Sequence, residues 1–163
     1  MIKFLRAIAI WSVAATPALA QDFVGEATAV EGDKIRVGVQ LILIYGIDSI
    51  DRDQKFCMLN EQLWDCYSVS FREMQILVAE GPVSCTKVSA DLYRRPIATC
   101  EVGGRDLGLA MVEAGMAFAF RLETDTYVAA EETAEAAEVG LWRSEFTYPW
   151  EFRAMWEGNI KER

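Results

Sequence analysis

Two cysteines lie symmetrically about a polar turn and predict an antiparallel hairpin. Residues 83–89 (VSCTKVS) and 96–102 (PIATCEV) are typical of strands, and the turn 91–94 (DLYR) lies between them. The midpoint of Cys85 and Cys100 is 92.5, which is also the midpoint of that turn. Closing the hairpin there places the two cysteines opposite each other on neighbouring strands. We therefore expect a disulfide between Cys85 and Cys100.

The other two cysteines, Cys57 and Cys66, are then expected to pair across a short loop. An even count of four cysteines favours disulfides in a small exported domain. A zinc site is the alternative, but the chain has no C-x-x-C spacing and no histidine. The lack of histidine also excludes Ser-His-Asp and Cys-His catalytic centres.

The N-terminus predicts export. Lys3 and Arg6 precede an uncharged, mostly apolar run, and residues 18–20 (ALA) form a small-x-small cleavage site. We interpret residues 1–20 as a signal peptide and residues 21–163 as one periplasmic or secreted domain, with no membrane span after signal removal. A transmembrane anchor is the alternative, but the run is shorter than the roughly 20 residues that a span needs.

The chain is acidic, which bears on its partners. Its net charge is −9, and it becomes −11 when the signal peptide takes away the two positive charges of Lys3 and Arg6. Bulk binding to nucleic acid, a polyanion, usually needs a basic face. The charge therefore disfavours nucleic acid or nucleotide as a partner, although a local site could still hold a phosphate. We expect a monomer.

The apolar pattern predicts strands first. Residues 23–47 alternate as in two or three strands with a turn at Gly32 and Asp33, whereas residues 49–62 read as polar and irregular. Helical spacing then appears over residues 71–80, before the hairpin.

Two more helices are expected after the hairpin. Asp106 can cap one that ends at Gly115, and the other runs from about residue 124 to residue 138. We expect the glutamates of the last helix to form a solvated face: Glu131, Glu132, Glu135 and Glu138. Three strands, a helix, two strands and two helices predict an α+β fold, a five-stranded OB-type Greek-key β-barrel capped by about three helices.

Several segments together resemble the staphylococcal-nuclease-like (thermonuclease) family. Their order and spacing match that family over roughly residues 24–153. The matching segments are GDKIRV (32–37), IYGID (44–48), DLYRR (91–95), AMVEAGMA (110–117), YVAAE (127–131), GLW (140–142) and PWE (149–151).

The resemblance implies a calcium-dependent phosphodiesterase site. In this family two aspartates and a backbone carbonyl bind calcium, a glutamate lies near the attacking water, and two arginines hold the phosphate. Asp33 and Asp48 match the two aspartates, and Ser49 holds the carbonyl position. Arg95 matches the second arginine.

Three departures from the family pattern fall in the catalytic site that the resemblance implies. Leu43 replaces the first phosphate arginine, Ile50 replaces a loop-stiffening proline, and Asp51 replaces the glutamate with a side chain one methylene shorter. Losing one charge-bearing transition-state contact costs on the order of 10²–10³ in rate. We therefore expect weak calcium binding and weak or absent catalysis.

Two further departures and two candidate replacements complete the comparison. Lys34 stands where the family has a threonine, and Phe120 corresponds to a tyrosine that lines the pocket. Arg36 matches a family arginine that takes no part in the catalytic site. Arg52, beside Asp51, is the better candidate to replace the missing arginine.

The resemblance leaves three functions open. The first is an exported domain that keeps the nuclease fold for a binding or structural role. The second is an active calcium-dependent nuclease with a rearranged site, so whether the protein is an enzyme stays open. The third and more distant one is an accessory role in exopolysaccharide biosynthesis, because some exported members of the family are encoded with succinoglycan genes.

Overall fold

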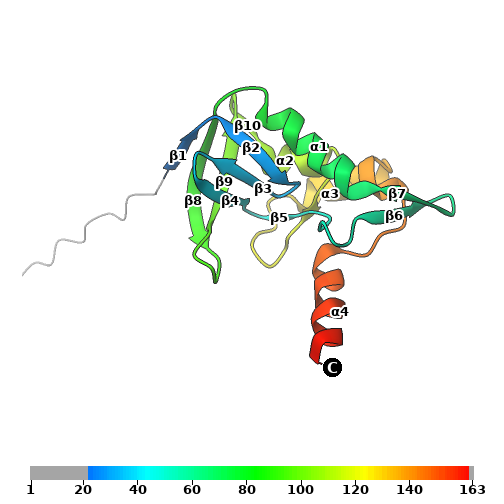
Figure 1. Cartoon of the computed structure of the whole chain (residues 1–163). Helices are drawn as coiled ribbons and strands as arrows, with labels where there is room; N and C mark the ends of the chain where they lie inside the picture. Colours follow the sequence, from blue (N-terminus) through cyan, green and yellow to red (C-terminus); the bar gives the residue numbers. More distant parts are fainter. Residues whose placement is uncertain (1–21, 162–163) are drawn as a thin grey trace, which may run out of the picture.

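A curved β-sheet covered by helices forms the body of the molecule (Figure 1). The computed structural model describes residues 22–161, so the expected signal peptide, residues 1–20, lies outside the described residues. The main sheet contains β1 (Asp22–Gly25), β2 (Ala27–Glu31), β3 (Lys34–Val37), β4 (Gln40–Ile44), β8 (Val83–Ala90), β9 (Pro96–Val102) and β10 (Arg105–Asp106). Two smaller sheets pair β5 (Ile47–Asp48) with β11 (Phe118–Ala119), and β6 (Phe56–Leu59) with β7 (Gln62–Asp65).

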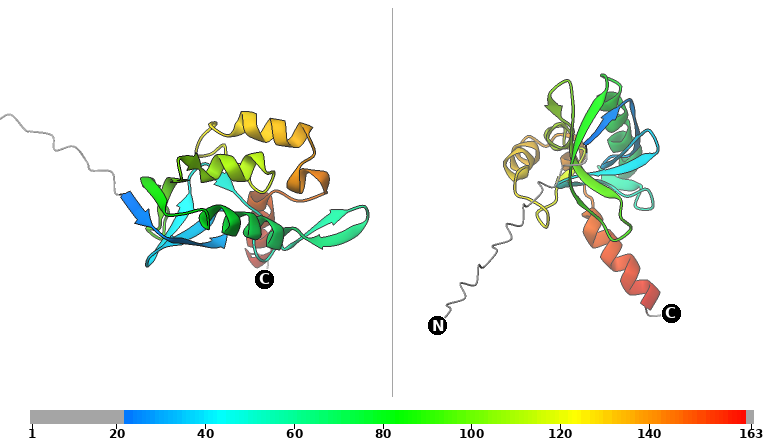
Figure 2. Two further views of the ribbon diagram at one scale, coloured as in Figure 1. Left: turned by 90° about the horizontal axis from the view of Figure 1, so that it is seen from above. Right: turned by 90° about the vertical axis from the view of Figure 1, so that its left-hand side faces the viewer.

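The helices are α1 (Cys66–Val78), α2 (Leu107–Glu113), α3 (Val128–Ala136) and α4 (Pro149–Lys161), with the short 3-10 helix η1 (Gly140–Arg143) before α4. Helix α1 lies along β2, and α2 contacts both β9 and α3. Helix α4 differs from the others, because it projects away from the body (Figure 1 and the right-hand view of Figure 2). In the described part of the chain, no helix is both long enough and apolar enough to cross a membrane.

The predicted α+β, OB-like fold is confirmed, with an open sheet in place of a closed barrel. The strand order is β1-β8-β9-β4-β3-β2, and only the β4–β9 pairing in this path is parallel. The two edges, β1 and β2, are separated by Glu26 alone. One bent segment therefore pairs with β8 through its first half and with β3 through its second, which curls the sheet around its core.

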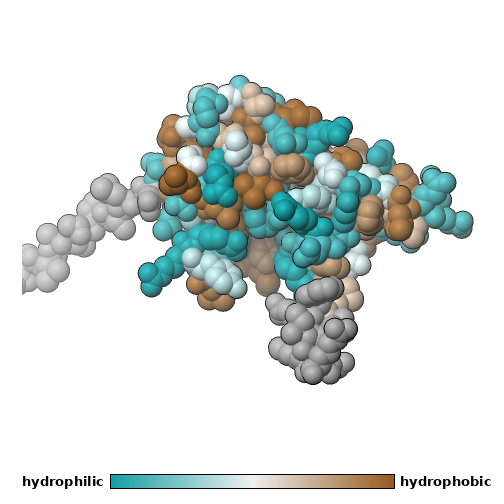
Figure 3. Space-filling model, in the orientation of Figure 1, coloured by the Kyte–Doolittle hydropathy of each residue, from teal (hydrophilic) through white to brown (hydrophobic). Residues whose placement is uncertain are grey.

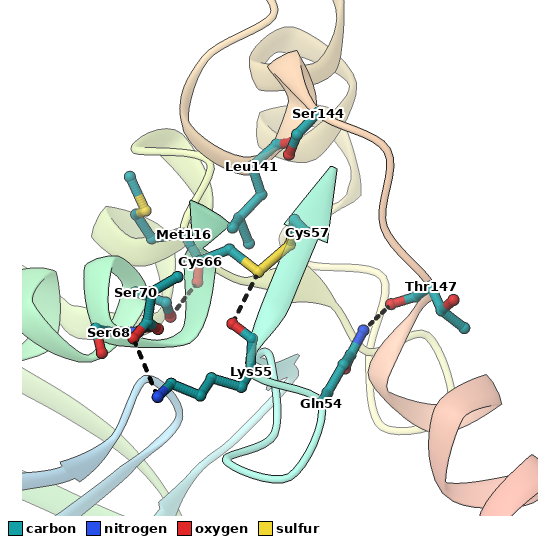
Figure 4. The surroundings of a disulfide bond; sticks show 11 residues. Gln54, Lys55, Cys57, Cys66, Ser68, Ser70, Met116, Leu141, Ser144 and Thr147 are labelled. Carbon is teal, nitrogen blue, oxygen red and sulfur yellow. Dashed lines mark hydrogen bonds and ion pairs between the residues drawn. A yellow bond between two sulfur atoms is a disulfide. The ribbon is translucent and has the colours of Figure 1, made fainter. Parts of the chain in front are cut away.

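The register of the β8–β9 hairpin places Cys85 opposite Cys100, and these two residues form a disulfide. The second disulfide joins Cys57 in β6 to Cys66 at the start of α1 (Figure 4). It closes the β6–β7 hairpin, where we had expected irregular chain. Helix α1 also starts earlier than expected, because the Asp65 carboxylate caps it by accepting the backbone N–H of Ser68 at 2.9 Å.

The expectation of a fully solvated glutamate face on the last helix was wrong for Glu131, which is only 3% exposed. Its carboxylate accepts the backbone N–H of Ala119 at 2.8 Å and pairs with Arg121 at 2.6 Å. The neighbouring Glu132 and Glu135 are exposed as expected. A buried polar group needs such partners, so Glu131 connects α3 to β11.

Candidate functional site

A pocket of about 420 Å³ lies where β4, β5, the β8–β9 turn and the start of α4 meet. We call it the carboxylate pocket. Five carboxylates and three cationic side chains lie among its lining residues. The lining residues are Asp33, Lys34, Leu43, Ile44, Ile47, Asp48, Asp51, Asp91, Arg95, Ile97, Phe120, Glu123 and Arg153.

The strands bring residues far apart in the sequence to this pocket. Asp33 occupies the β2–β3 turn and Asp48 ends β5, and both are buried. Leu43 lies in β4 opposite Lys34 of β3 and Ile97 of β9. Asp51 and Arg95 also line the pocket, whereas Ser49 does not; its hydroxyl donates to Asp33 Oδ1 at 3.2 Å.

Arg153, from α4, holds two of the carboxylates. Its Nη2 lies 2.5 Å from Asp48 Oδ2, and its Nη1 donates to Asp48 Oδ1 at 3.2 Å and to Asp51 Oδ2 at 2.8 Å. Ion pairs in which both groups are charged and share two hydrogen bonds are the strong ones. The guanidinium therefore supplies the positive charge between Asp48 and Asp51.

Asp33 is also paired with a cationic side chain. Lys34 Nζ lies 3.0 Å from Asp33 Oδ1 and also pairs with Glu31. Burial alone would lower the pKa of Lys34, but the charges of Asp33 and Glu31 and their hydrogen bonds raise it well above its usual range. Lys34 is therefore a permanent cation at the edge of the pocket.

The turn between β8 and β9 carries the retained arginine. Arg95 Nε donates to Asp91 Oδ2 at 2.6 Å, and the other oxygen of Asp91 accepts the backbone N–H groups of Tyr93 and Arg95. Burial opposes the effect, but these hydrogen bonds lower the pKa of Asp91. The carboxylate orients Arg95 toward the pocket through Nε. Among the described residues, no hydrogen bond is recorded for its two Nη atoms.

Burial controls the charge of Asp48. Removal from water, together with the nearby negative charge of Asp33, raises the pKa of this carboxyl group to about 6, and the hydrogen bonds from Arg153 act in the opposite direction. Asp48 is thus ionised at neutral pH, as its ion pair with Arg153 requires. The cost of an unpaired charge at this position would be high, because the side chain is only 6% exposed.

These pairings leave a poor donor set for calcium. A hard cation needs six to eight oxygen ligands, yet Asp33, Asp48 and Asp51 already bind Lys34 or Arg153. Among the residues that the structure describes, no three Asp, Glu, Cys or His side chains are arranged to hold a metal ion. The residues as they stand do not fit a calcium ion.

The structure also shows the environments of the Ile50 departure and of Arg52, the candidate replacement for the missing arginine. Ile50 is fully buried beside Phe118 and Leu141, so apolar packing holds the loop where the family uses a proline. Arg52 does not line the pocket. Its Nε donates to the Tyr67 hydroxyl at 3.2 Å, and its guanidinium lies 5.9 Å from the centre of that ring. The arginine that does reach the carboxylates, Arg153, was not among our sequence-based candidates.

Glu123 is a second residue that sequence reasoning missed. Its carboxylate accepts the backbone N–H of Gly46 at 2.7 Å, and its backbone carbonyl accepts the Tyr45 hydroxyl at 2.7 Å. Burial and the charge of Asp33 raise the pKa of Glu123, against the Gly46 hydrogen bond. These contacts position the turn immediately before β5, which carries Asp48. No local motif marks Glu123, because its partners lie more than 70 positions away.

The outer surface differs in character from the pocket. Hydrophobic and hydrophilic residues are interspersed over the body on the face shown in Figure 3. Two nearly fully exposed apolar side chains flank the carboxylate pocket in sequence: Leu92, beside Asp91, and Leu122, beside Glu123. Two of the turns beside the pocket thus each present an exposed apolar side chain.

Comparison with known proteins gives two findings. A family model described as staphylococcal nuclease homologue matches residues 68–144. The chain is also 27% identical over 135 residues to "Succinoglycan biosynthesis protein ExoI" of Rhizobium meliloti (strain 1021), an alignment that covers 77% of this chain and 68% of that protein. The family match includes Arg95, whereas Asp33, Asp48, Asp51 and α4 lie outside it.

Proposed function

We propose, from the premise that residues 68–144 belong to the staphylococcal nuclease homologue family, that this protein is an exported, non-hydrolytic domain with a binding or structural role. The pairing of Arg153 with Asp48 and Asp51 carries the proposal. Two disulfides and the absence of a membrane-spanning helix from the described residues are compatible with export.

Phosphodiester hydrolysis needs positive charge on the phosphate and a carboxylate that orients water. Leu43 offers neither a donor nor a charge at the strand position where the resemblance implies an arginine. Asp51 is already bound to Arg153, so it is poorly suited to orient a water molecule. Two requirements of the reaction are thus missing from the same pocket. Such losses are not strictly additive, but both lower the rate of hydrolysis.

An active nuclease is the alternative, supported by the retained Asp33, Asp48 and Arg95. In that case Arg153 would supply the second phosphate contact in place of Leu43. The geometry favours the non-hydrolytic role, because the Arg153 donors point at carboxylates. A guanidinium that is already neutralised contributes less to phosphate binding than one that is not.

Purified protein should cut single-stranded DNA in calcium at least about 10² times more slowly than staphylococcal nuclease assayed beside it, because one phosphate contact is missing. A Leu43→Arg, Asp51→Glu, Arg153→Gln variant should cut at least about tenfold faster than the wild type. Asp48→Asn is the control for contaminating nuclease. Wild-type cleavage at the rate of the reference enzyme, abolished by Asp48→Asn, would show that the site is catalytic.

The relative from Rhizobium meliloti supports a second candidate, an accessory role in exopolysaccharide biosynthesis. Deleting the gene in its own host should then reduce secreted polysaccharide. The wild-type gene should restore it, and so should an Asp48→Asn version if the role needs no hydrolysis. Unchanged polysaccharide in the deletion strain would eliminate this candidate.

A further inference from the structure

A second pocket, of about 310 Å³, lies beside the carboxylate pocket. We call it the apolar pocket, and its lining residues are Ala119, Phe120, Arg121, Leu122 and Trp150. Phe120 lines both pockets, so the two adjoin at this side chain. Sites for small ligands usually have volumes of about 300–1,000 Å³. The two pockets together are therefore large enough to hold a ligand that extends from one into the other.

The same two elements contribute side chains to both pockets. In the segment after β11, Leu122 lines the apolar pocket and Glu123 lines the carboxylate pocket. In α4, Trp150 lines the apolar pocket and Arg153 the carboxylate pocket, and residues three apart lie on the same side of a helix. A ligand that lies across the boundary therefore meets apolar side chains on one part of its surface and charged side chains on another.

The apolar pocket presents aromatic rings to such a ligand. The rings of Phe120 and Trp150 have centroids 6.0 Å apart and are inclined to each other by 43°. Tyr148 fixes the plane of the Trp150 ring by stacking on it at 4.6 Å. Leu122 is 87% exposed, so a ligand in this pocket would remove apolar surface from water.

The carboxylate pocket keeps hydrogen-bonding atoms that a ligand can use. One oxygen of Glu123 accepts the Gly46 N–H, and one oxygen of Asp51 accepts a hydrogen bond from Arg153. Among the described residues, no hydrogen bond is recorded for the other oxygen of either carboxylate, nor for the two Nη atoms of Arg95. A hydroxyl group can both donate to such oxygens and accept from such nitrogens.

The balance of charge disfavours an anionic ligand. The carboxylate pocket has five carboxylates and three cationic side chains among its lining residues. In the apolar pocket, the charge of Arg121 is already paired with Glu131 at 2.6 Å. A phosphate or another anion would meet net negative charge here. A fitting ligand is neutral, has one apolar face and carries several hydroxyl groups, and a hexopyranose has all three properties.

We propose that the two pockets together form a binding site for a neutral hexopyranose unit of a glycan chain. The C–H face of the sugar ring lies on Phe120 and Trp150, because the negatively polarised faces of aromatic rings attract C–H groups. The hydroxyl groups enter the carboxylate pocket, where they donate to Asp51 and Glu123 and accept from Arg95. This inference names the ligand class of the proposed binding role and therefore rests on that role.

Saturation-transfer difference NMR tests the site without reference to activity, with the neutral oligosaccharides cellotetraose, laminaritetraose and galactotetraose as probes. At least one should bind saturably, with a dissociation constant on the order of 1 mM or below. Leu122→Ser should weaken this binding at least about threefold, because it removes apolar contact area. Leu63→Ser is the matched control, since Leu63 is an exposed leucine of β7 that lines neither pocket.

Two further variants test the aromatic and the polar contacts. Trp150→Leu should weaken oligosaccharide binding at least about tenfold, whereas Trp150→Phe, which keeps an aromatic ring, should lose less. Glu123→Gln keeps the shape of the side chain and an acceptor for Gly46 but loses the charge that strengthens hydrogen bonds from hydroxyl groups. It should weaken oligosaccharide binding at least about threefold, whereas the binding of an anionic thymidine tetranucleotide would become tighter.

No saturable binding of any of the three oligosaccharides overturns the sugar site. Equal effects of Leu122→Ser and Leu63→Ser also overturn it, as does an oligosaccharide affinity that Glu123→Gln leaves unchanged or raises. Leu122→Ser and Glu123→Gln change side chains that solvent reaches, so they provide the test if Trp150→Leu does not fold. DNA cleavage is scored separately: rapid cleavage by wild type refutes the non-hydrolytic role, whereas failure of the oligosaccharide series refutes only the sugar site.

Discussion

Arg153→Gln should lower the free energy of unfolding by about 2–3 kcal/mol at neutral pH. Removing one partner of a buried ion pair costs about 3–5 kcal/mol, because a charge is left without compensation. The lower figure reflects the partial exposure of Arg153, whose side chain is 42% accessible, since solvent screens such pairs. Urea denaturation followed by circular dichroism measures the change.

The loss of stability caused by Arg153→Gln should depend on pH in a defined direction. Burial raises the folded-state pKa of Asp48 to about 6 from its usual value of 3.8, so the folded state prefers the protonated form. Ionisation as the pH rises through this interval therefore costs stability, and Arg153 offsets that cost. The loss caused by Arg153→Gln should be smaller at about pH 5 than at about pH 8.

Two controls separate this pair from general charge effects. Arg105→Gln should change stability by less than about 0.5 kcal/mol, because its ion pair is exposed. Adding Asp48→Asn to Arg153→Gln should recover part of the loss, since the amide carries no charge that needs a partner. If Arg153→Gln and Arg105→Gln have the same small effect, Arg153 does not neutralise a buried charge in solution.

Replacing Cys85 and Cys100 together by alanine should lower the free energy of unfolding by about 3 kcal/mol. The disulfide closes a loop with a sequence separation of 15, and cross-links of this length stabilise by about that amount. Both residues are buried in the main core, so removing their sulfur atoms also leaves space that the core must fill. The stability of oxidised wild type and of the variant is compared in the same denaturant series.

Replacing Cys57 and Cys66 by alanine is the informative comparison. Their sequence separation is 9, so the expected loss from chain entropy is slightly smaller, about 2.6 kcal/mol. This bridge closes the hairpin that holds the segment before α4, so its removal should also loosen α4.

An unchanged unfolding free energy in the Cys85 and Cys100 variant would contradict the first of these two predictions. It would mean that the β8–β9 hairpin holds its register without the disulfide.

Local patterns in the sequence determined the β8–β9 hairpin and α2. A turn midway between two cysteines indicates a register, because facing residues in a hairpin are equidistant from its turn. Asp106 caps α2 as predicted and accepts the Leu109 N–H at 2.9 Å, while Gly115 follows the helix at a positive φ of 65°. The resemblance singled out Asp33 and Asp48, and both line the carboxylate pocket.

Only the tertiary structure decided which charges meet in the pocket. Arg153 and Asp48 are 105 positions apart, and Ala119 and Glu131 meet through a hydrogen bond between β11 and a helix that we had expected to be solvated on that face. Periodicity and capping describe interactions within a few residues, so they carry no information on which distant element a charged side chain will reach. Burial makes Asp48 and Asp51 require a cationic partner. The folded chain provides it by placing Arg153 of α4, a helix outside the matched family region, next to both carboxylates.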